Sequence, residues 1–142
     1  MMKILFVCHG NICRSPMAEF VTKDMVKKAG IGDQFQIDSA AASREEIGNP
    51  IYGPAQRELT KHGILGASHR ARQITAGDLD YYDRIYYMDG RNAQYLRRLF
   101  PDFTGFRPFL PHDVADPWYS GDFTQTWNDI QDGCRRILEE FL

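Results

Sequence analysis

The feature that most constrains how this chain can fold is a short apolar segment that leads directly into a glycine-containing loop. Residues 3–7 are apolar after the first, and such a short run is typical of a strand buried on both faces of a parallel sheet. From residue 15 to residue 29 apolar side chains recur at helical spacing. Pro16 suits the first turn of that helix, and Gly30 ends it. The sequence therefore predicts a strand, a loop that begins at Cys8, and a helix.

Further along the chain, strand-like and helix-like segments alternate. Turn signals fill residues 43–54. Strands are predicted over residues 35–40, 84–88 and, weakly because a proline interrupts it, 106–110; helices are predicted over 55–62, 91–100 and 123–142. This alternation predicts a layered α/β fold around a parallel sheet with right-handed crossovers.

The carboxyl ends of the predicted strands carry polar and reactive side chains. In parallel sheets of this kind, ligands bind at this edge, near the point where the strand order switches. Cys8 directly follows the first predicted strand, and Asp89 follows the strand predicted over residues 84–88. We therefore expect a ligand site at this edge of the sheet.

Size and composition limit the class of protein. The 142 residues suggest a single domain over residues 1–142, and a net charge of −2 gives no sign of a nucleic-acid partner. No apolar run approaches the length of a membrane span, and residues 1–7 are too short for a signal peptide. Three cysteines favour free thiols in a reducing compartment, so we expect a cytoplasmic protein with no membrane partner.

The loop from Cys8 to Ser15 has the features of a phosphate cradle. The first N–H groups of a helix have no partners within the helix, and the helix dipole adds positive potential there. Gly10 lets the backbone curl with no side chain in the way, so that successive N–H groups can point at a dianion. Arg14 adds a planar fork that can hold two phosphate oxygens.

The same setting prepares Cys8 for nucleophilic attack. A thiol at a helix N-terminus beside an arginine is held largely as the thiolate near neutral pH. From the bottom of the cradle, the sulfur can displace an alcohol from phosphorus and form a phosphocysteine. The hydroxyl of Ser15 can donate to this sulfur and make it a better leaving group in the second step.

A cysteine followed six residues later by an arginine is weak evidence by itself. With three cysteines, such a pair arises by chance about one time in six. The buried strand before Cys8, the loop glycine, the hydroxyl after Arg14 and the helix beyond make the signal strong. The alternative is a core cysteine at a strand end, beside an arginine that caps a backbone group.

A leaving phenolate also needs a proton donor near the mouth of the cradle. By sequence alone, Asp113, Asp116 and Asp122 are all candidates on one loop. Asp116 is distinguished by Pro117, which holds it in an extended conformation, and by flanking aromatic residues. The alternative for an Asp-Pro pair is a simple turn.

Several stretches of the chain resemble the low-molecular-weight protein tyrosine phosphatases. They are residues 7–19, 38–40, 47–50, 68–74, 88–89 and 116–119, which read VCHGNICRSPMAE, DSA, IGNP, SHRARQI, MD and DPWY. They follow the order of the family's motifs and cover nearly the whole chain. The resemblance implies a flavodoxin-like, three-layer fold with a four-stranded parallel sheet and helices on both faces. It also implies that neither a metal nor a cofactor is needed.

The resemblance assigns roles to individual residues. It implies that Cys8 is the nucleophile, that Arg14 binds the phosphoryl group and that Asp116 acts as general acid and then as base. The implied phosphate-binding loop comprises His9, Gly10, Asn11, Ile12, Cys13, Arg14 and Ser15. Cys13 is implied to form a reversible disulfide with Cys8 that protects it from over-oxidation. Cys134, on an apolar helix face, is expected in the core.

A second group of residues is expected to support the loop and to shape the cleft. The resemblance places Asn11, Ser15, Ser39 and His69 in a polar network that holds the loop in a strained shape, and asparagine suits a left-handed backbone position there. Cleft walls are expected from Ile12, Glu45, Trp118 and Tyr119. Many relatives carry an aromatic residue where counting from Ser39 places Glu45, so we expect this wall to disfavour strongly acidic peptides.

Four other functions compete with this hypothesis. Zinc binding would use Cys8, His9 and Cys13, but no second ligand pair stands at the usual spacing. A thioredoxin-coupled arsenate reductase of the same fold would need relay cysteines, and none stands between Cys13 and Cys134. A phosphoprotein-binding module has no need of a nucleophile. A phosphoarginine phosphatase tends to carry threonine where this chain has Ile12.

The expected partner is therefore a phosphotyrosine-containing protein or a small aryl phosphate. Ile12 offers an apolar wall to an aromatic ring, and the shorter phosphoserine should not reach the sulfur of Cys8. Phosphate-like anions are expected to compete for the loop. We expect a monomer, with weak self-association through the exposed tyrosines near Asp116.

Overall fold

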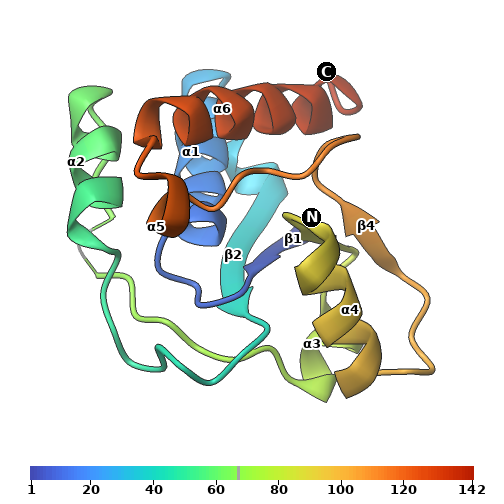
Figure 1. Cartoon of the computed structure of the whole chain (residues 1–142). Helices are drawn as coiled ribbons and strands as arrows, with labels where there is room; N and C mark the ends of the chain where they lie inside the picture. Colours follow the sequence, from blue (N-terminus) through green and yellow to red (C-terminus); the bar gives the residue numbers. More distant parts are fainter. Residues whose placement is uncertain (67) are drawn as a thin grey trace.

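A parallel sheet lies between two layers of helices in the computed structural model, which describes residues 1–142 except residue 67 (Figure 1). The strands are β1 (Met2–Cys8), β2 (Phe35–Ala41), β3 (Arg84–Tyr87) and β4 (Phe106–Pro108). Their order in the sheet is β2-β1-β3-β4, and every neighbouring pair is parallel. This topology confirms the predicted flavodoxin-like α/β fold.

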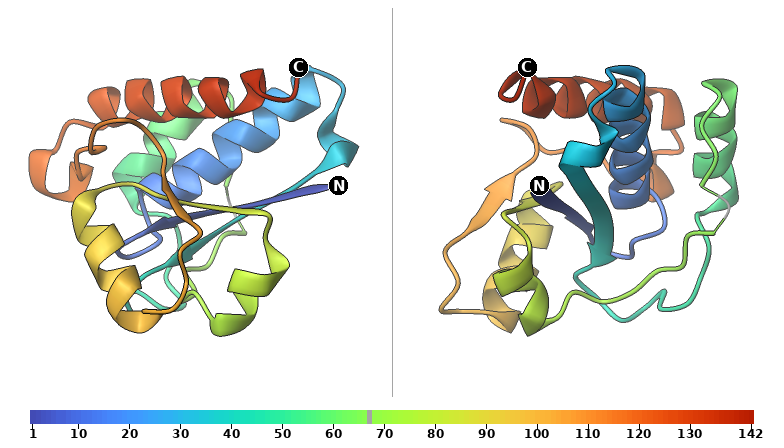
Figure 2. Two further views of the ribbon diagram at one scale, coloured as in Figure 1. Left: turned by 90° about the vertical axis from the view of Figure 1, so that its right-hand side faces the viewer. Right: turned by 180° about the vertical axis from the view of Figure 1, so that it is seen from behind.

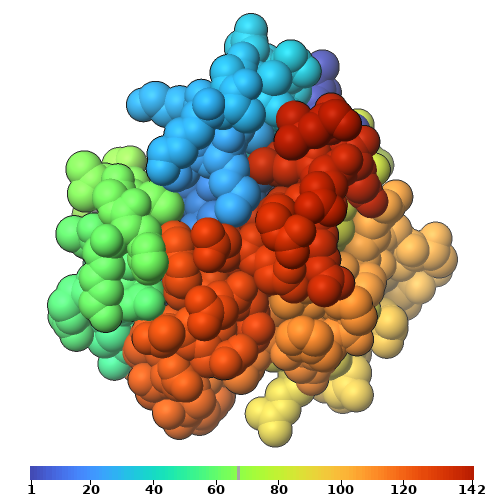
Figure 3. All heavy atoms as spheres, turned by 90° about the horizontal axis from the view of Figure 1, so that it is seen from above, coloured from blue at the N-terminus to red at the C-terminus, as the bar shows by residue number. Residues whose placement is uncertain are grey.

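Helices cover both faces of the sheet. They are α1 (Arg14–Lys28), α2 (Gly53–Lys61), α3 (Ala76–Tyr81), α4 (Gly90–Leu99), α5 (Pro117–Ser120) and α6 (Phe123–Glu139), with a 3-10 turn η1 (Gly32–Gln34) before β2. Helices α1 and α6 lie together on one face, while α3 and α4 lie on the other (Figures 1 and 2). Seen from above, the atoms of α2 lie beside those of α1 and α6 (Figure 3).

Strand β1 explains the continuous apolar run near the start of the chain. Its side chains alternate between two cores, because successive residues of a strand point to opposite faces. Ile4 and Phe6 join the core beneath α1 and α6, whereas Leu5 and Val7 join the core shared with Leu96 of α4. All four side chains have no solvent exposure, so both faces of the strand need apolar residues.

Helix α6 shows the apolar face that its spacing predicted. The buried residues include Trp127, Ile130, Cys134, Ile137 and Leu138. This face packs on α1 and closes the core of the first layer. Among the described residues, no helix combines the length and the apolar character needed to cross a bilayer.

Some element boundaries differ from the sequence prediction. Helix α2 begins at Gly53, inside the predicted turn, because Pro54 is tolerated in a first helical turn. Helix α6 ends at Glu139 rather than residue 142, and β4 ends at Pro108 rather than residue 110. Two short helices, α3 and α5, were not predicted. Both begin at a side-chain cap, at Thr75 and Asp116, and are too short for a visible periodicity.

The fold brings three segments to the carboxyl edge of the sheet. Cys8 is the last residue of β1, and Arg14 is the first residue of α1. Asp89 follows β3 and caps α4, accepting a hydrogen bond from the backbone N–H of Asn92. The loop between Cys8 and Arg14 therefore lies where the sequence placed a ligand site.

Candidate active site

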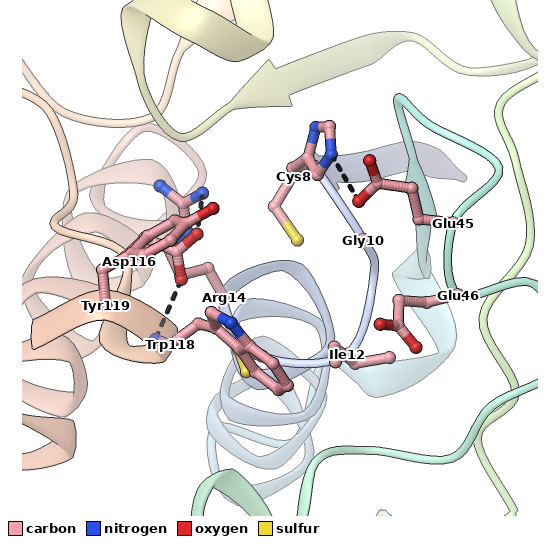
Figure 4. A pocket seen from close by; sticks show the side chains of 11 residues that line it. Cys8, Gly10, Ile12, Arg14, Glu45, Glu46, Asp116, Trp118 and Tyr119 are labelled. Carbon is pink, nitrogen blue, oxygen red and sulfur yellow. Dashed lines mark hydrogen bonds and ion pairs between the residues drawn. The ribbon is translucent and has the colours of Figure 1, made fainter. Parts of the chain in front are cut away.

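The sulfur of Cys8 lies at the base of a cavity and faces three hydrogen-bond donors. The Sγ atom is 3.3 Å from the backbone nitrogen of Asn11 and 3.4 Å from that of Ser15. It is also 3.0 Å from the hydroxyl oxygen of Ser15. These groups curl around the sulfur, and in Figure 4 it points into the cavity. Several donors directed at one sulfur stabilise negative charge on it.

Asn11 holds the turn of the loop. Its φ is 61°, and it is the one non-glycine residue in the left-handed region among the described residues. Its Nδ2 group donates to Ser15 Oγ at 2.8 Å and to Ser39 Oγ at 2.9 Å. Its Oδ1 atom accepts from the backbone N–H of Arg72 at 3.2 Å. Its own carbonyl is 2.8 Å from Nε2 of His69. The four supporting residues expected from the sequence therefore lie together in one network.

The network continues to a buried carboxylate that was not predicted. Ser39 Oγ donates to Glu19 Oε1 at 2.6 Å, and Lys23 Nζ lies 2.5 Å from Glu19 Oε2. Because the Ser39 hydroxyl donates its proton to Glu19, its oxygen acts only as an acceptor toward Asn11. Since Asn11 also donates to Ser15, the Ser15 hydroxyl is left to donate, and the sulfur of Cys8 at 3.0 Å is closer to it than the carbonyl of Ala40 at 3.5 Å. Glu19 thus orients the whole chain of hydrogen bonds toward the sulfur.

Arg14 is anchored by groups that lie far from it in the sequence. Its side chain is 2% exposed, and Nη1 donates to Asp89 Oδ2 and to the carbonyl of Val114, both at 2.7 Å. Its Nη2 is 3.4 Å from Asp116 Oδ2. Burial works against the charged guanidinium, but the nearby sulfur of Cys8 and the carboxylates of Asp116 and Asp89 outweigh it and raise the pKa of Arg14. The fork is fixed before any ligand binds.

Asp89 shows the reciprocal effect. Burial alone would raise its pKa, but hydrogen bonds from Arg14 and from the backbone N–H of Asn92 outweigh burial, and the pKa of Asp89 is lowered. The carboxylate therefore stays charged beside Arg14 at neutral pH. The sequence placed Asp89 at this edge of the sheet but did not assign it this partner.

The three candidate proton donors have separate surroundings. Asp116 Oδ1 accepts from the backbone N–H of Trp118 at 3.0 Å, and its carboxyl borders the cavity that holds Cys8. Asp113 Oδ1 accepts from the backbone N–H of Gly90, and Asp122 caps α6 by accepting from Gln125. Of the three, Asp116 alone lines the cavity above the sulfur among the described residues.

Two unlike walls border the cavity. Figure 4 shows Trp118 and Tyr119 on one side and Glu45 and Glu46 on the other, with Cys8 between them. Trp118 and Tyr119 are 52% and 79% exposed. Trp118 rests on Tyr52, with ring centroids 4.7 Å apart, so this wall has support that the sequence did not reveal.

The acidic wall lies close to the loop. Glu45 Oε2 is 2.9 Å from Nε2 of His9, and Glu46, which was not predicted, accepts from Asn49. A side chain at Gly10 would place Cβ 3.2 Å from Cγ of Glu46. Gly10 therefore permits this close approach of the acidic wall, whereas the left-handed turn expected of the loop belongs to Asn11.

The remaining cysteines differ in their surroundings. Cys13 borders the same cavity as Cys8, and burial together with the negative charge on Cys8 raises its pKa well above the ordinary value. Cys134 has no solvent exposure, and burial raises its pKa to about 12, as expected of a core residue. All three cysteines have free thiols in this structure. Among the described residues, no three His, Cys, Asp or Glu side chains gather as a metal site would require.

The residues that sequence reasoning missed come from distant segments. Glu19 lies on the buried face of α1, where an acidic residue is itself a signal of a polar partner. Glu46 stands beside the predicted Glu45. The backbone of Arg72 reaches Asn11 because an ion pair between Arg72 and Asp78 of α3 holds its segment in place. That contact has no local sequence signal.

Comparison with known proteins agrees with this geometry. A family model described as "Low molecular weight phosphotyrosine protein phosphatase" matches residues 3–141. The chain is 37% identical to the low molecular weight protein-tyrosine-phosphatase YfkJ of Bacillus subtilis, over 97% of this chain and 94% of the relative. It is 44% identical to low molecular weight phosphotyrosine protein phosphatase 1 of Drosophila melanogaster, over 99% of this chain and 97% of the relative.

Solved structures show the same similarity. The crystal structure of YfkJ superposes with a TM-score of 0.94, covering 99% of this chain and 94% of that one at 36% identity. The crystal structure of a drosophila arginine phosphatase superposes with a TM-score of 0.89, covering 99% of this chain and 98% of that one at 29% identity.

Proposed function

Because the chain belongs to the low molecular weight phosphotyrosine protein phosphatase family, we propose that it hydrolyses phosphotyrosine through a phosphocysteine intermediate on Cys8. The observation that carries this proposal is the Cys8 sulfur, which faces three donors at the base of a cavity that Arg14 and Asp116 also border. A thiolate, a phosphate-binding fork and a proton donor in one cavity meet the needs of phosphate-ester cleavage. Residues 1–142 form one phosphatase domain in this proposal.

The first step transfers the phosphoryl group to the enzyme. The phosphate dianion occupies the loop from His9 to Ser15, where backbone N–H groups and the guanidinium of Arg14 bind its oxygens. The sulfur of Cys8 attacks phosphorus as the bond from phosphorus to the tyrosyl oxygen breaks. Asp116 gives its proton to that oxygen, and tyrosine leaves. Arg14 does not have to reorganise, because Asp89 and Val114 already hold it.

The second step returns the enzyme to its starting state. Asp116, now a carboxylate, takes a proton from water as the water oxygen bonds to phosphorus. The bond from sulfur to phosphorus breaks, inorganic phosphate leaves, and Cys8 regains its negative charge. The hydroxyl of Ser15 stabilises this charge by donating across the 3.0 Å contact.

Substrate choice follows from the walls of the cavity. Ile12, Trp118 and Tyr119 offer apolar surface to a flat ring, which supports aryl phosphates over phosphoserine. Phosphoarginine is the second candidate substrate, because the fold of the drosophila arginine phosphatase is so similar. Ile12 supports phosphotyrosine over phosphoarginine, since its side chain is apolar and has no hydroxyl for the leaving group.

Four further features belong to the same proposal. Asn11, Ser15, Ser39 and His69 keep the loop in its binding shape, as the network around Asn11 supports. Cys13 protects Cys8 through a reversible disulfide, which its place on the same cavity supports. The protein works in the cytoplasm, as a monomer with weak self-association. Phosphate-like anions compete with the substrate, because the loop binds the dianion itself.

Turnover of p-nitrophenyl phosphate and of tyrosine-, serine- and arginine-phosphorylated peptides tests the proposal. We expect the phosphotyrosine peptide to be the best of the three, and Cys8→Ser to abolish turnover. Asp116→Ala should lose more activity on phenyl phosphate than on p-nitrophenyl phosphate, because the poorer leaving group needs the proton more. Asp113→Asn is the matched control from the same loop and should show no such dependence on the leaving group.

Three results would contradict the proposal. Turnover by Cys8→Ser would show that Cys8 is not the nucleophile. Sensitivity of the wild type to a chelator would favour a metal mechanism. Thioredoxin-coupled reduction of arsenate would favour the arsenate reductase function over the phosphatase function.

A further inference from the structure

A second depression lies beside the catalytic cavity and shares part of its lining. The two share His9, Arg14, Asp116 and Tyr119 in their linings. The second depression extends from these residues along α4. A peptide whose phosphate reached Cys8 would therefore have a surface for a neighbouring side chain.

One face of α4 supplies the cationic lining of this depression. Arg91, Tyr95 and Arg98 line it, and their spacing of four and three residues places them on the same side of the helix. The ring of Tyr95 packs edge-on against His9, with centroids 5.9 Å apart. Tyr95 therefore joins this face to the phosphate-binding loop.

The carboxylates of the depression have hydrogen-bond partners within the protein, whereas two of its arginines have none among the described residues. Each carboxylate has a donor within the protein: Asp89 has Arg14, Asp113 has the backbone N–H of Gly90, and Asp116 has that of Trp118. Among the described residues, the guanidinium groups of Arg91 and Arg98 take part in no ion pair or hydrogen bond.

A third donor in this lining is buried. Asn92 is 1% exposed, and its Oδ1 accepts from the backbone N–H groups of Met88 and Asp89. Its Nδ2 group has no hydrogen-bond partner among the described residues. This Nδ2 group has almost no accessible surface, so among the described residues the unpaired cationic donors that an anion in the depression can reach are the exposed guanidinium groups of Arg91 and Arg98.

The other side of the cavity mouth has the opposite charge. Glu45 and Glu46 line the catalytic cavity there, and neither lines the depression along α4. His9 stands between the two sides, because it contacts Glu45 with Nε2 and Tyr95 with its ring. A peptide lying across the mouth therefore meets acidic side chains on one side and arginines on the other.

We propose that Arg91 and Arg98 form a subsite for an acidic side chain of the substrate, near its phosphotyrosine in sequence. This inference rests on the proposed phosphatase function and names the class of peptide that the enzyme prefers. Helix α4 rises about 1.5 Å per residue, so Arg98 lies roughly 13 Å along the axis from Asp89, which anchors Arg14. An extended peptide covers that distance in about four residues. The preferred acidic residue therefore lies within about four positions of the phosphotyrosine, on one side of it.

The test compares phosphotyrosine peptides that carry glutamate at single positions up to four residues before or after the phosphotyrosine. We expect glutamate on one side to raise kcat/KM about fivefold over a neutral peptide at low salt, and glutamate on the other side to lower it. Added salt should reduce the gain, because the subsite is open to solvent. A peptide with phosphoserine at the favoured position distinguishes a carboxylate from a second phosphate.

Variants of α4 locate the effect. In the double variant Arg91→Ala/Arg98→Ala, the ratio of kcat/KM for the acidic peptide to that for the neutral one should fall to about one. Arg98→Glu should invert the preference. Arg97→Glu is the matched control, because Arg97 is exposed on the same helix and does not line the depression. It makes the same change of net charge and should leave the ratio as in the wild type.

The outcomes separate this inference from the proposed function. No turnover of the neutral phosphotyrosine peptide by the wild type would overturn both. Turnover of that peptide with no preference for glutamate at any position would overturn the subsite alone. The subsite would also be overturned by an equal loss of preference in Arg97→Glu, or by a gain that phosphoserine gives and glutamate does not.

Discussion

Asn11 donates from Nδ2 to the hydroxyl oxygen of Ser15 over 2.8 Å, and this contact orients the hydroxyl that faces Cys8. The same residue takes the left-handed turn of the loop, at a φ of 61°. Backbone shape and hydroxyl orientation therefore depend on one side chain. Substitutions at this position can separate the two contributions.

Asn11→Gly and Asn11→Ala should both lose activity but differ in stability. Each removes the bonds from the side chain to Ser15, Ser39 and Arg72, so we expect kcat for p-nitrophenyl phosphate to fall at least tenfold, equivalent to about 1.4 kcal/mol. Glycine takes the left-handed turn freely, whereas alanine is penalised by about 1 kcal/mol. Thermal unfolding should therefore place the glycine variant a few degrees above the alanine variant. Wild-type kcat in the glycine variant would contradict the role of the network.

Asp89→Asn should destabilise the protein in a pH-dependent way. The pKa of Asp89 is lowered in the folded state, so its charge stabilises the fold above the ordinary value of 3.8. This stabilisation is lost as the pH falls through the lowered pKa. Asparagine still caps α4 but has no charge for Arg14. Urea unfolding should show a loss of about 1–3 kcal/mol near neutral pH that shrinks in acid. A loss that is constant with pH would count against the charged contact.

Cys13→Ser should make oxidation of the enzyme irreversible. Peroxide oxidises the Cys8 thiolate to a sulfenic acid and is itself reduced to water. In the wild type, the sulfur of Cys13 then attacks that of Cys8, releases water and forms a disulfide that dithiothreitol reduces. In the serine variant, oxidation continues to sulfinic acid, so dithiothreitol should restore little activity. Cys134→Ala, which changes a core thiol, is the control and should recover like the wild type. Equal recovery by Cys13→Ser would exclude the protective disulfide.

Gly133→Ala should destabilise the fold, although alanine usually stabilises a helix by about 1 kcal/mol relative to glycine. A Cβ atom at Gly133 would clash with the ring of Phe109, which lies in the same core as the buried face of α6. We expect a loss of about 1–3 kcal/mol in urea unfolding. Gly77→Ala in α3 is the control, since its nearest contact would be an ordinary 3.7 Å. In the double variant Phe109→Leu/Gly133→Ala, the loss of unfolding free energy should be smaller than the sum of the losses in the two single variants. Strict additivity would show that the two side chains do not clash.

The strongest predictions from the sequence concern segments in which the relevant residues are neighbours in the chain. The strand, loop and helix from β1 to α1 were predicted because apolar spacing and turn residues act over a few positions. Short helices such as α3 and α5 escaped prediction, because one or two turns leave no measurable period. Their caps at Thr75 and Asp116 were the local signal that was available.

By itself, the sequence determined the cradle: Cys8, Asn11, Arg14 and Ser15 stand within eight residues, so chain connectivity brings them together around one anion. The tertiary structure decided which distant groups complete it. Asp89 follows Arg14 by 75 residues, and the two meet because β1 and β3 are neighbours in the sheet. Asp113, Asp116 and Asp122 are close in sequence, yet each faces a different partner. Local spacing cannot distinguish them, because the direction of a side chain depends on the packing of the whole loop.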